Sequence, residues 1–462
     1  MDGEGTPGDF PPEFVEFLRS LVGDRADGLI EAMRATNFDP RAVMENANLP
    51  DTPATRAFLV DKLRRALATM SSKDPVNWES AHELARHVAS AGGDPSVSDA
   101  QAKQVRDALG VADLWLDSAT AFPASGGQAL ALSSAQWIET TWDAWRRMVG
   151  PVATSVADVL ANAIVRHQEH APGEATDELL SMMRAMSAAA FAMQIGKSIG
   201  DMSREVMGLT DVGLPLTDPR STGLLPASIE RFADGLAANL DEVRLFLAVR
   251  EAASARLFTH ARWLGPHLLG AVAAYINEVD VDIERIERAV ADIDPSDESA
   301  LREALANGAM ALNHTPAQTA ALERLETALA LVEGWVDEVS RTAVTDRLPH
   351  AAGLGEMIRR RRVMGSPAER AFGTLVGLTL RPRRAREAAA LWRSVADAEG
   401  LEGRESIWSH PDLLPTSADL EDGSTYAANR ASPDTAEVDA AIAQLLHPPP
   451  PEPDPDPEDG GG

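Results

Sequence analysis

The stretch DEVRLFLAVREAASARLFTHARWLGPHL, residues 241–268, decides the fold that we predict for this chain. Ala, Leu, Glu and Arg dominate it, and neither glycine nor proline interrupts it before Gly265, which is typical of an α-helix. Its apolar run Leu245 to Val249 ends at Arg250 and Glu251, far short of the roughly 18 apolar residues that a membrane span requires. The sequence therefore predicts a helix with charged residues in its middle.

The same helical composition continues through most of the chain, which is 44% hydrophobic and 24% charged, as is typical of globular proteins. Alternating β-branched runs are scarce, so we expect a mainly α fold with little or no β structure. We predict an N-terminal helical segment at 1–70 and a helical domain at 76–420. An acidic, proline-rich tail at 421–462 is expected to be largely disordered, with one amphipathic helix predicted at 435–446.

Charge and cysteine content exclude several classes of protein. The formal net charge of −29 argues against a nucleic-acid or anionic-membrane partner, because both need clustered positive charge. The chain has no cysteine, which excludes disulfides, thiolate metal sites and a cysteine nucleophile. Met1 to Asp9 lacks the basic start and apolar segment of an export signal. We therefore expect a cytoplasmic protein without a membrane span, whose partner is an unidentified protein or peptide.

Two motif-like sequences fail on spacing. His82 and His87 flank a glutamate as in H-E-x-x-H, but they are five residues apart and so point about 140° away from one another on a helix. The Gly-Lys-Ser that begins at Gly196 lacks the glycine that a phosphate-binding loop requires five residues earlier, where Phe191 stands. We instead expect Gly196 and Gly200 to allow close approach of another helix.

Arginines are concentrated between residues 359 and 386, with Glu369 as the only acid in that span. They are Arg359, Arg360, Arg361, Arg362, Arg370, Arg381, Arg383, Arg384 and Arg386. Such a cluster could bind phosphate or a carboxylate-rich partner, or it could pair with the molecule's own acidic residues, including those of the tail. We favour internal pairing, because a count of charges says little about specific recognition.

Several segments, together with 241–268, resemble in order those of the zincin-like family of zinc-dependent metalloproteases and hydrolases of high-GC, actinobacterial-type bacteria. They are residues 76–78, 114–117, 136–137 with 145–146, 210–216, 331–337, 375–383 and 407–415. In members with a complete site, the helix carries H-E-x-x-H. The two histidines bind zinc, and the glutamate takes a proton from the zinc-bound water. The resemblance implies a zincin-like helical domain over most of the chain.

The corresponding five residues here are Arg250-Glu251-Ala252-Ala253-Ser254, so the motif is degenerate and keeps only its glutamate. The resemblance places a third ligand near Glu333, and Trp335 stands where related sequences can carry histidine. We therefore expect no metal-binding set and no cofactor. We expect Arg250 to pair with Glu333 and to take over the structural role of the metal, because a buried charge is rarely left without a partner.

The favoured interpretation is a pseudoenzyme, a non-catalytic relative that binds its partner through the old cleft or the arginine cluster. The alternative is an active zinc metallopeptidase or hydrolase with an unusual site of Glu251, Glu333 and His260. His260 lies about 120° around the helix from Ser254, so we expect it on another face. A hydrolase that uses Ser254 is a third alternative, although no base or oxyanion donors are recognisable near it.

Overall fold

The structure is a computed structural model that describes residues 76–150, 191–277, 316–363, 365, 369–371, 373 and 384–431. The predicted N-terminal segment and the predicted helix at 435–446 lie outside these residues. The chain divides into two compact units, residues 1–84 with 153–196 and residues 85–152 with 197–462. The candidate site belongs entirely to the second unit.

Helix α5 (Trp78–Ser90) and the helical residues 191–203 approach each other closely through two glycines. A Cβ atom on Gly196 would lie 2.5 Å from the carbonyl oxygen of Ala81, and one on Gly200 would lie 2.8 Å from that of Ala85. Only glycine fits such distances, which confirms the expected close helix packing. The Gly-Lys-Ser sequence is thus part of a helix.

The second unit is mostly helical, as predicted. Its helices with complete bounds are α6 (Asp99–Leu116), α9 (Pro226–Ala233), α10 (Leu240–His260), α11 (Leu264–Asn277), α14 (Pro316–Val344), α15 (Ala351–Val363), α17 (Ala385–Ser406) and α18 (Gly423–Ala431). Two short 3₁₀ turns, η3 (Ile407–Ser409) and η4 (Pro411–Leu413), follow α17. Strands β1 (Ala129–Ala131) and β2 (Thr222–Leu224) pair in parallel, with Ala129 opposite Thr222. None of the described helices is long and apolar enough to cross a membrane.

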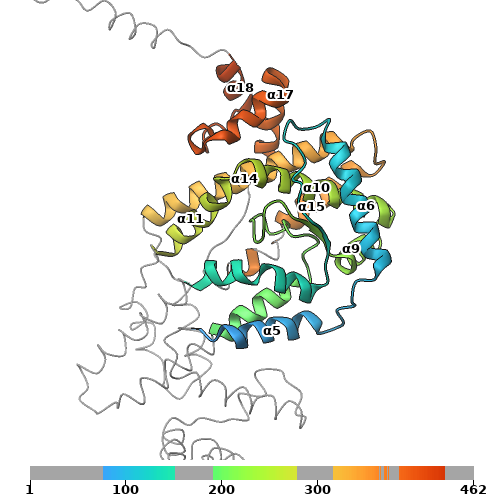
Figure 1. Ribbon diagram of the computed structural model, residues 1–462. Helices are drawn as coiled ribbons and strands as arrows, with labels where there is room; N and C mark the ends of the chain where they lie inside the picture. The colour runs from blue at the N-terminus through green and yellow to red at the C-terminus, as the bar shows by residue number, and fades with distance from the viewer. Residues whose placement is uncertain are drawn as a thin grey trace, which may run out of the picture. The chain divides into compact units, whose positions relative to one another are not determined.

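Helix α10 is the central element of this unit (Figure 1), and α6, α9, α14, α15 and β2 all contact it. The side chain of Asn239 caps its N-terminus by accepting a hydrogen bond of 2.9 Å from the backbone N–H of Glu242. With Leu245 as the one exception, every residue from Glu242 to Phe258 is buried. The charged residues within this span must therefore find partners inside the protein.

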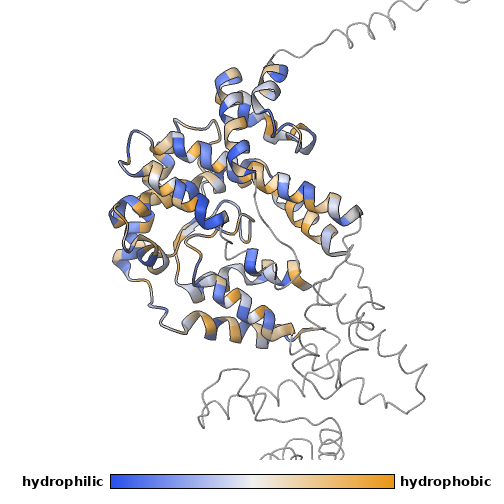
Figure 2. Ribbon diagram, turned by 180° about the vertical axis from the view of Figure 1, so that it is seen from behind, coloured by the Kyte–Doolittle hydropathy of each residue, from blue (hydrophilic) through white to orange (hydrophobic). Residues whose placement is uncertain are grey.

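Helix α14 contacts α10, α11 and α17. A Cβ atom on Gly334 would lie 2.5 Å from the Cβ of Ala388, so this glycine lets α14 and α17 pack closely. The indole of Trp392 donates a 2.9 Å hydrogen bond to the carbonyl oxygen of Leu331 and stacks on Trp408. Figure 2 shows hydrophobic and hydrophilic residues mixed along each helix, as expected where one face packs inward.

Residues 423–431, which the sequence places in the predicted tail, form α18 and pack against α17. Asp422 accepts hydrogen bonds from the backbone N–H of Thr425 and from the hydroxyls of Ser424 and Thr425. These polar residues cap a helix start. The helical part of this unit thus continues past residue 421.

Candidate active site

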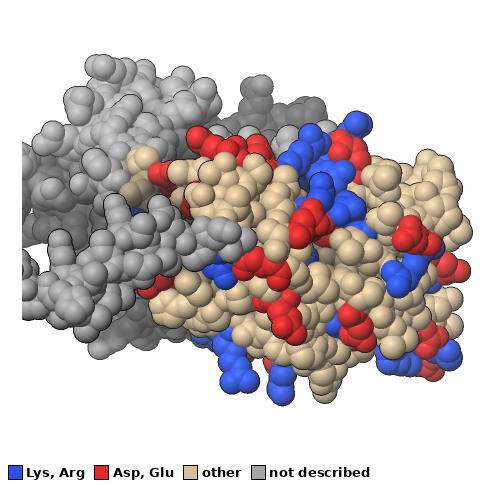
Figure 3. Space-filling view, turned by 90° about the horizontal axis from the view of Figure 1, so that it is seen from above, with Lys and Arg blue, Asp and Glu red and all other residues tan. Residues whose placement is uncertain are grey.

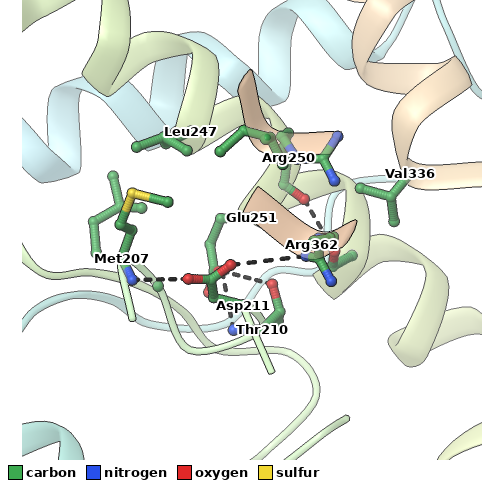
Figure 4. Close-up of a pocket in the computed structure, with 12 residues that line it drawn as sticks. Met207, Thr210, Asp211, Leu247, Arg250, Glu251, Val336 and Arg362 are labelled. Carbon is green, nitrogen blue, oxygen red and sulfur yellow. Dashed lines mark hydrogen bonds and ion pairs between the residues drawn. The ribbon is translucent and has the colours of Figure 1, made fainter. Parts of the chain in front are cut away.

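The middle of α10 borders a small pocket with a cavity volume of about 30 Å³, room for about two water molecules. Figure 4 shows Arg250 and Glu251 of α10 beside Thr210 and Asp211 of the preceding loop and Arg362 of α15. The pocket is lined by Met207, Gly208, Thr210, Asp211, Leu224, Leu247, Arg250, Glu251, Ser254, Val336, Ile358 and Arg362. It therefore brings together elements that are far apart in the sequence.

Arg250 is buried and forms ion pairs with two carboxylates of α14. It donates hydrogen bonds to Glu333 and, over 3.1 Å, to Asp337. The first pair confirms the partner predicted from the sequence. Asp337 is a partner that the motif does not indicate, although it lies four residues after Glu333 and hence on the same face of the helix. Burial alone would lower the pKa of Arg250, but Glu333 and Asp337 raise it above its ordinary value.

Arginines of α15 bind the same carboxylates from the other side. Arg359 donates to Asp337 over 3.0 Å, and Arg362 lies 3.1 Å from Glu333. Arg362 also lies 3.7 Å from the loop carboxylate of Asp211. These contacts join α10, α14 and α15 in one cluster of alternating charges.

Most other described members of the arginine cluster also pair with acids of the molecule, as favoured above. Arg361 donates to Asp211 over 3.2 Å, and Arg370 pairs with Glu205. Burial raises the pKa of Asp211, but Arg361 and Arg362 outweigh it and hold that pKa below its ordinary value. Arg381 and Arg383 lie outside the described residues.

Glu251 contacts neutral donors only. One carboxylate oxygen accepts from the hydroxyl and the backbone N–H of Thr210 (2.6 and 3.1 Å), and the other accepts from the N–H of Gly223 (3.0 Å). A Cβ atom on Gly208 would lie 2.5 Å from this carboxylate. Burial, helped by the charge of Asp211, raises the pKa of Glu251 to about 7, although the donors oppose the shift.

Ser254 and His260 do not join Glu251 in a catalytic arrangement. The hydroxyl of Ser254 donates back to the carbonyl oxygen of Arg250 over 3.1 Å, four residues earlier. His260 is exposed, stacks on Phe122, and has its Nε2 atom 3.1 Å from the carbonyl oxygen of Pro123. As its spacing predicts, His260 therefore points away from the pocket.

Trp335, the residue that the resemblance places where related sequences can carry histidine, points away from Arg250. Its indole is buried and donates a 3.2 Å hydrogen bond to Glu405 of α17. The helical repeat of about 100° explains this, since two residues place Trp335 roughly 200° from Glu333. The residues of α14 that face α10 are instead Glu333, Val336 and Asp337.

The resemblance implies a zinc ion, and the residues present do not fit one. Arg250 has only donors and a permanent positive charge, and Glu333 is already held by Arg250 and Arg362. Ser254 offers a hydroxyl, whereas zinc sites in proteins are built from imidazole, thiolate and carboxylate ligands. Among the residues that the structure describes, no three His, Asp or Glu side chains converge in a way that could hold a metal ion.

Comparison with known proteins agrees with the resemblance. A family model for zincin-like metallopeptidases matches residues 76–427. The fold is similar to that of a crystal structure from Chloroflexus aurantiacus, described as "a putative hydrolase with a novel fold", with a TM-score of 0.55 and 16% sequence identity over 77% of this chain and 99% of that chain. No curated protein matches the chain in sequence. Because the family model matches most of its length, the chain belongs to the zincin-like metallopeptidase family.

Proposed function

We propose that this chain is a non-catalytic member of its family with a degenerate zinc motif, and that it acts in the cytoplasm by binding a protein or peptide partner. The observation that carries the proposal is the position of Arg250, buried between Glu333 and Asp337. Its guanidinium replaces the metal ion as the cation that holds α10 and α14 together.

Electrostatics favours this replacement over a weakened metal site. A divalent cation beside Arg250 would be repelled by about 8 kcal/mol at 4 Å, taking an effective dielectric constant of 20 and twice the unit-charge energy. To bind there, zinc would have to displace the guanidinium of Arg250 from both carboxylates. The displaced guanidinium would then carry its positive charge without partners. Neither Ser254 nor Arg250 has an imidazole that could bind the zinc ion.

The second candidate is an active zinc metallopeptidase or hydrolase that uses Glu251 and Glu333. One observation favours it, namely that the pKa of Glu251 is about 7 and thus suits proton transfer near neutral pH. Against it, both oxygens of Glu251 already accept hydrogen bonds, and Glu333 is bound by two guanidiniums. Catalysis would require these contacts to break.

Metal analysis of protein purified without an affinity tag tests the proposal. After equilibration with zinc and dialysis, the unmodified chain should retain far less than one zinc. The double variant R250H/S254H restores H-E-x-x-H next to Glu333 and should retain about one zinc per chain. The matched control R250Q/S254A changes the same positions without adding imidazoles and should retain none.

Two outcomes would contradict the proposal. About one zinc in the unmodified chain, lost in Glu333→Ala, would establish the metalloenzyme alternative. Failure of R250H/S254H to gain zinc, in a variant that circular dichroism shows to be folded, would mean that Arg250 does not stand at a former metal position.

A further inference from the structure

The junction of α15 and α17 carries more arginine than its acids can neutralise. Glu356 alone accepts from three guanidiniums, those of Arg359 (3.2 Å), Arg360 (2.9 Å) and Arg386 (3.1 Å). Arg359 also forms an ion pair with Asp337, which already pairs with Arg250. Sharing of this kind leaves a local excess of positive charge.

This excess is accessible to solvent. The side chains of Arg360 and Arg386 are 70% and 67% exposed. Arg384, just before α17, donates to neutral acceptors, the carbonyl and hydroxyl oxygens of Ser417. The N-terminus of α17 adds partial positive charge, while Glu387 is the only acid in its first turn. We call Arg360, Arg384 and Arg386 the α15–α17 basic surface.

We propose that the α15–α17 basic surface binds the acidic segment 452–459 of the same chain. The segment reads EPDPDPED and places five carboxylates within eight residues. In the extended form that alternating prolines favour, every second residue is about 6 Å further along, so successive carboxylates can reach separate arginines. Arginine binds carboxylates with two parallel hydrogen bonds, which suits this pairing.

The connecting chain is long enough to reach. The described residues end at Ala431 in α18, where Arg430 lies 3.1 Å from Glu399 of α17. Along α17, Glu399 is about 20 Å from Arg386 at 1.5 Å per residue. Residues 432–451 can span up to about 45 Å if the helix predicted at 435–446 forms, and up to about 65 Å if they are fully extended. The segment can therefore reach the surface without strain.

Tethering favours this segment over an acidic peptide from another molecule. Exposed ion pairs are individually weak, so a free peptide would need a high concentration to occupy the surface. A linker of this length supplies an effective concentration in the millimolar range. Figure 3 shows one face of the molecule, on which basic and acidic side chains lie side by side. When bound, the tail would keep other carboxylate-rich partners away, whether or not the chain binds metal.

Fluorescence energy transfer in the full-length chain tests this binding. Because the chain has no cysteine, Gly462→Cys and Ala390→Cys, the latter at an exposed position on α17, create unique labelling sites. We expect strong transfer at low salt that falls by about half near 0.5 M salt, as screening shortens the reach of the charges. Adding R360Q/R386Q should lower transfer at low salt to the high-salt value.

The matched control is R86Q/R220Q, which removes the same charge at side chains that are 58% and 63% exposed. It should leave the transfer unchanged. Equal transfer in R360Q/R386Q and the control would overturn the proposal. Transfer between mixed, singly labelled chains that matches that of the doubly labelled chain would overturn it as well, because the surface would then bind the tail of a second copy.

Discussion

Arg250 and Glu251 are neighbours on α10 and almost equally buried, with 6% and 4% of their surfaces exposed, yet their charges are compensated in different ways. Arg250 lies among opposite charges, the carboxylates of Glu333 and Asp337. Glu251 lies among neutral donors, the hydroxyl and N–H of Thr210 and the N–H of Gly223. The cost of burying a charge is thus offset by ion pairs on one side of the helix and by neutral hydrogen-bond donors on the other.

The pKa values show whether ion pairs or neutral donors offset the cost of burial more fully. Full opposite charges overcome the burial of Arg250 and raise its pKa, so the guanidinium stays charged. Three neutral donors do not overcome the burial of Glu251, whose pKa rises to about 7 with help from the like charge of Asp211. Arg250 therefore stays charged, whereas Glu251 can gain or lose its proton near neutral pH.

The largest effect is predicted for a substitution that removes the ion pairs of Arg250. Arg250→Ala should lower the free energy of unfolding by about 3–5 kcal/mol, as expected when one member of a buried pair is removed. Arg359 and Arg362 still contact the two carboxylates, which favours the lower end of this range. Urea denaturation measures the change.

Arg220→Ala is the control for Arg250→Ala, because Arg220 also pairs with an aspartate but is 63% exposed. It should change stability by no more than about 0.5 kcal/mol. A change of similar size in Arg250→Ala would show that the buried cluster does not hold α10 to α14.

The second effect concerns the protonation of Glu251. Its folded pKa of about 7 lies above the ordinary value of 4.5, so the folded state binds the proton more tightly than the unfolded state. The stabilisation is fully present below pH 4.5 and is lost as the pH rises to 7. A shift of this size corresponds to about 3 kcal/mol.

Glu251→Gln isolates this contribution, because the amide does not titrate while the other acids remain. The difference in unfolding free energy between the unmodified chain and Glu251→Gln should change by about 3 kcal/mol between pH 4.5 and pH 7. The unmodified chain should lose stability relative to the variant. A constant difference across this range would mean that Glu251 stays ionised, as Arg250 does.

Much of the fold could be predicted from local sequence. The unbroken helical composition of 241–264 predicts α10, and the spacing of Gly196 and Gly200 predicts a close helix contact, both as observed. The start of the tail was harder to place, because the polar residues that cap α18 at Asp422 are equally typical of a loop.

The site could be predicted only where the motif or the helical repeat applied. The resemblance to the H-E-x-x-H helix indicated Arg250, Glu251 and the pairing with Glu333. The partners of Glu251 come from a loop and a strand some 30 to 40 residues earlier, and two of their three hydrogen bonds are donated by the backbone, which carries no sequence signal. The side on which Trp335 lies follows from the 100° helical repeat, which places it away from Glu333 and beside Glu405.

The smallest predicted effect tests how tightly the loop holds Glu251. Gly208→Ala would place a Cβ atom 2.5 Å from the carboxylate of Glu251 and 3.0 Å from the carbonyl oxygen of Gly223. The carboxylate must move, at a cost of about 1–3 kcal/mol, typical of overpacking. Gly110→Ala is the control. It lies in α6 with nothing within 4 Å of the added carbon and should stabilise the protein by about 0.5–1 kcal/mol.

A double-mutant cycle then separates the two contacts of the added methyl group. If the carboxylate is the main obstacle, Gly208→Ala should cost less in a Glu251→Ala background, with a coupling energy of about 1 kcal/mol. If the cost is the same in both backgrounds, the carbonyl oxygen of Gly223 sets it and the position of Glu251 is incidental. The first result would mean that this carboxylate is held in place by the shape of the loop as well as by its donors, in contrast to Arg250, which is held by charge.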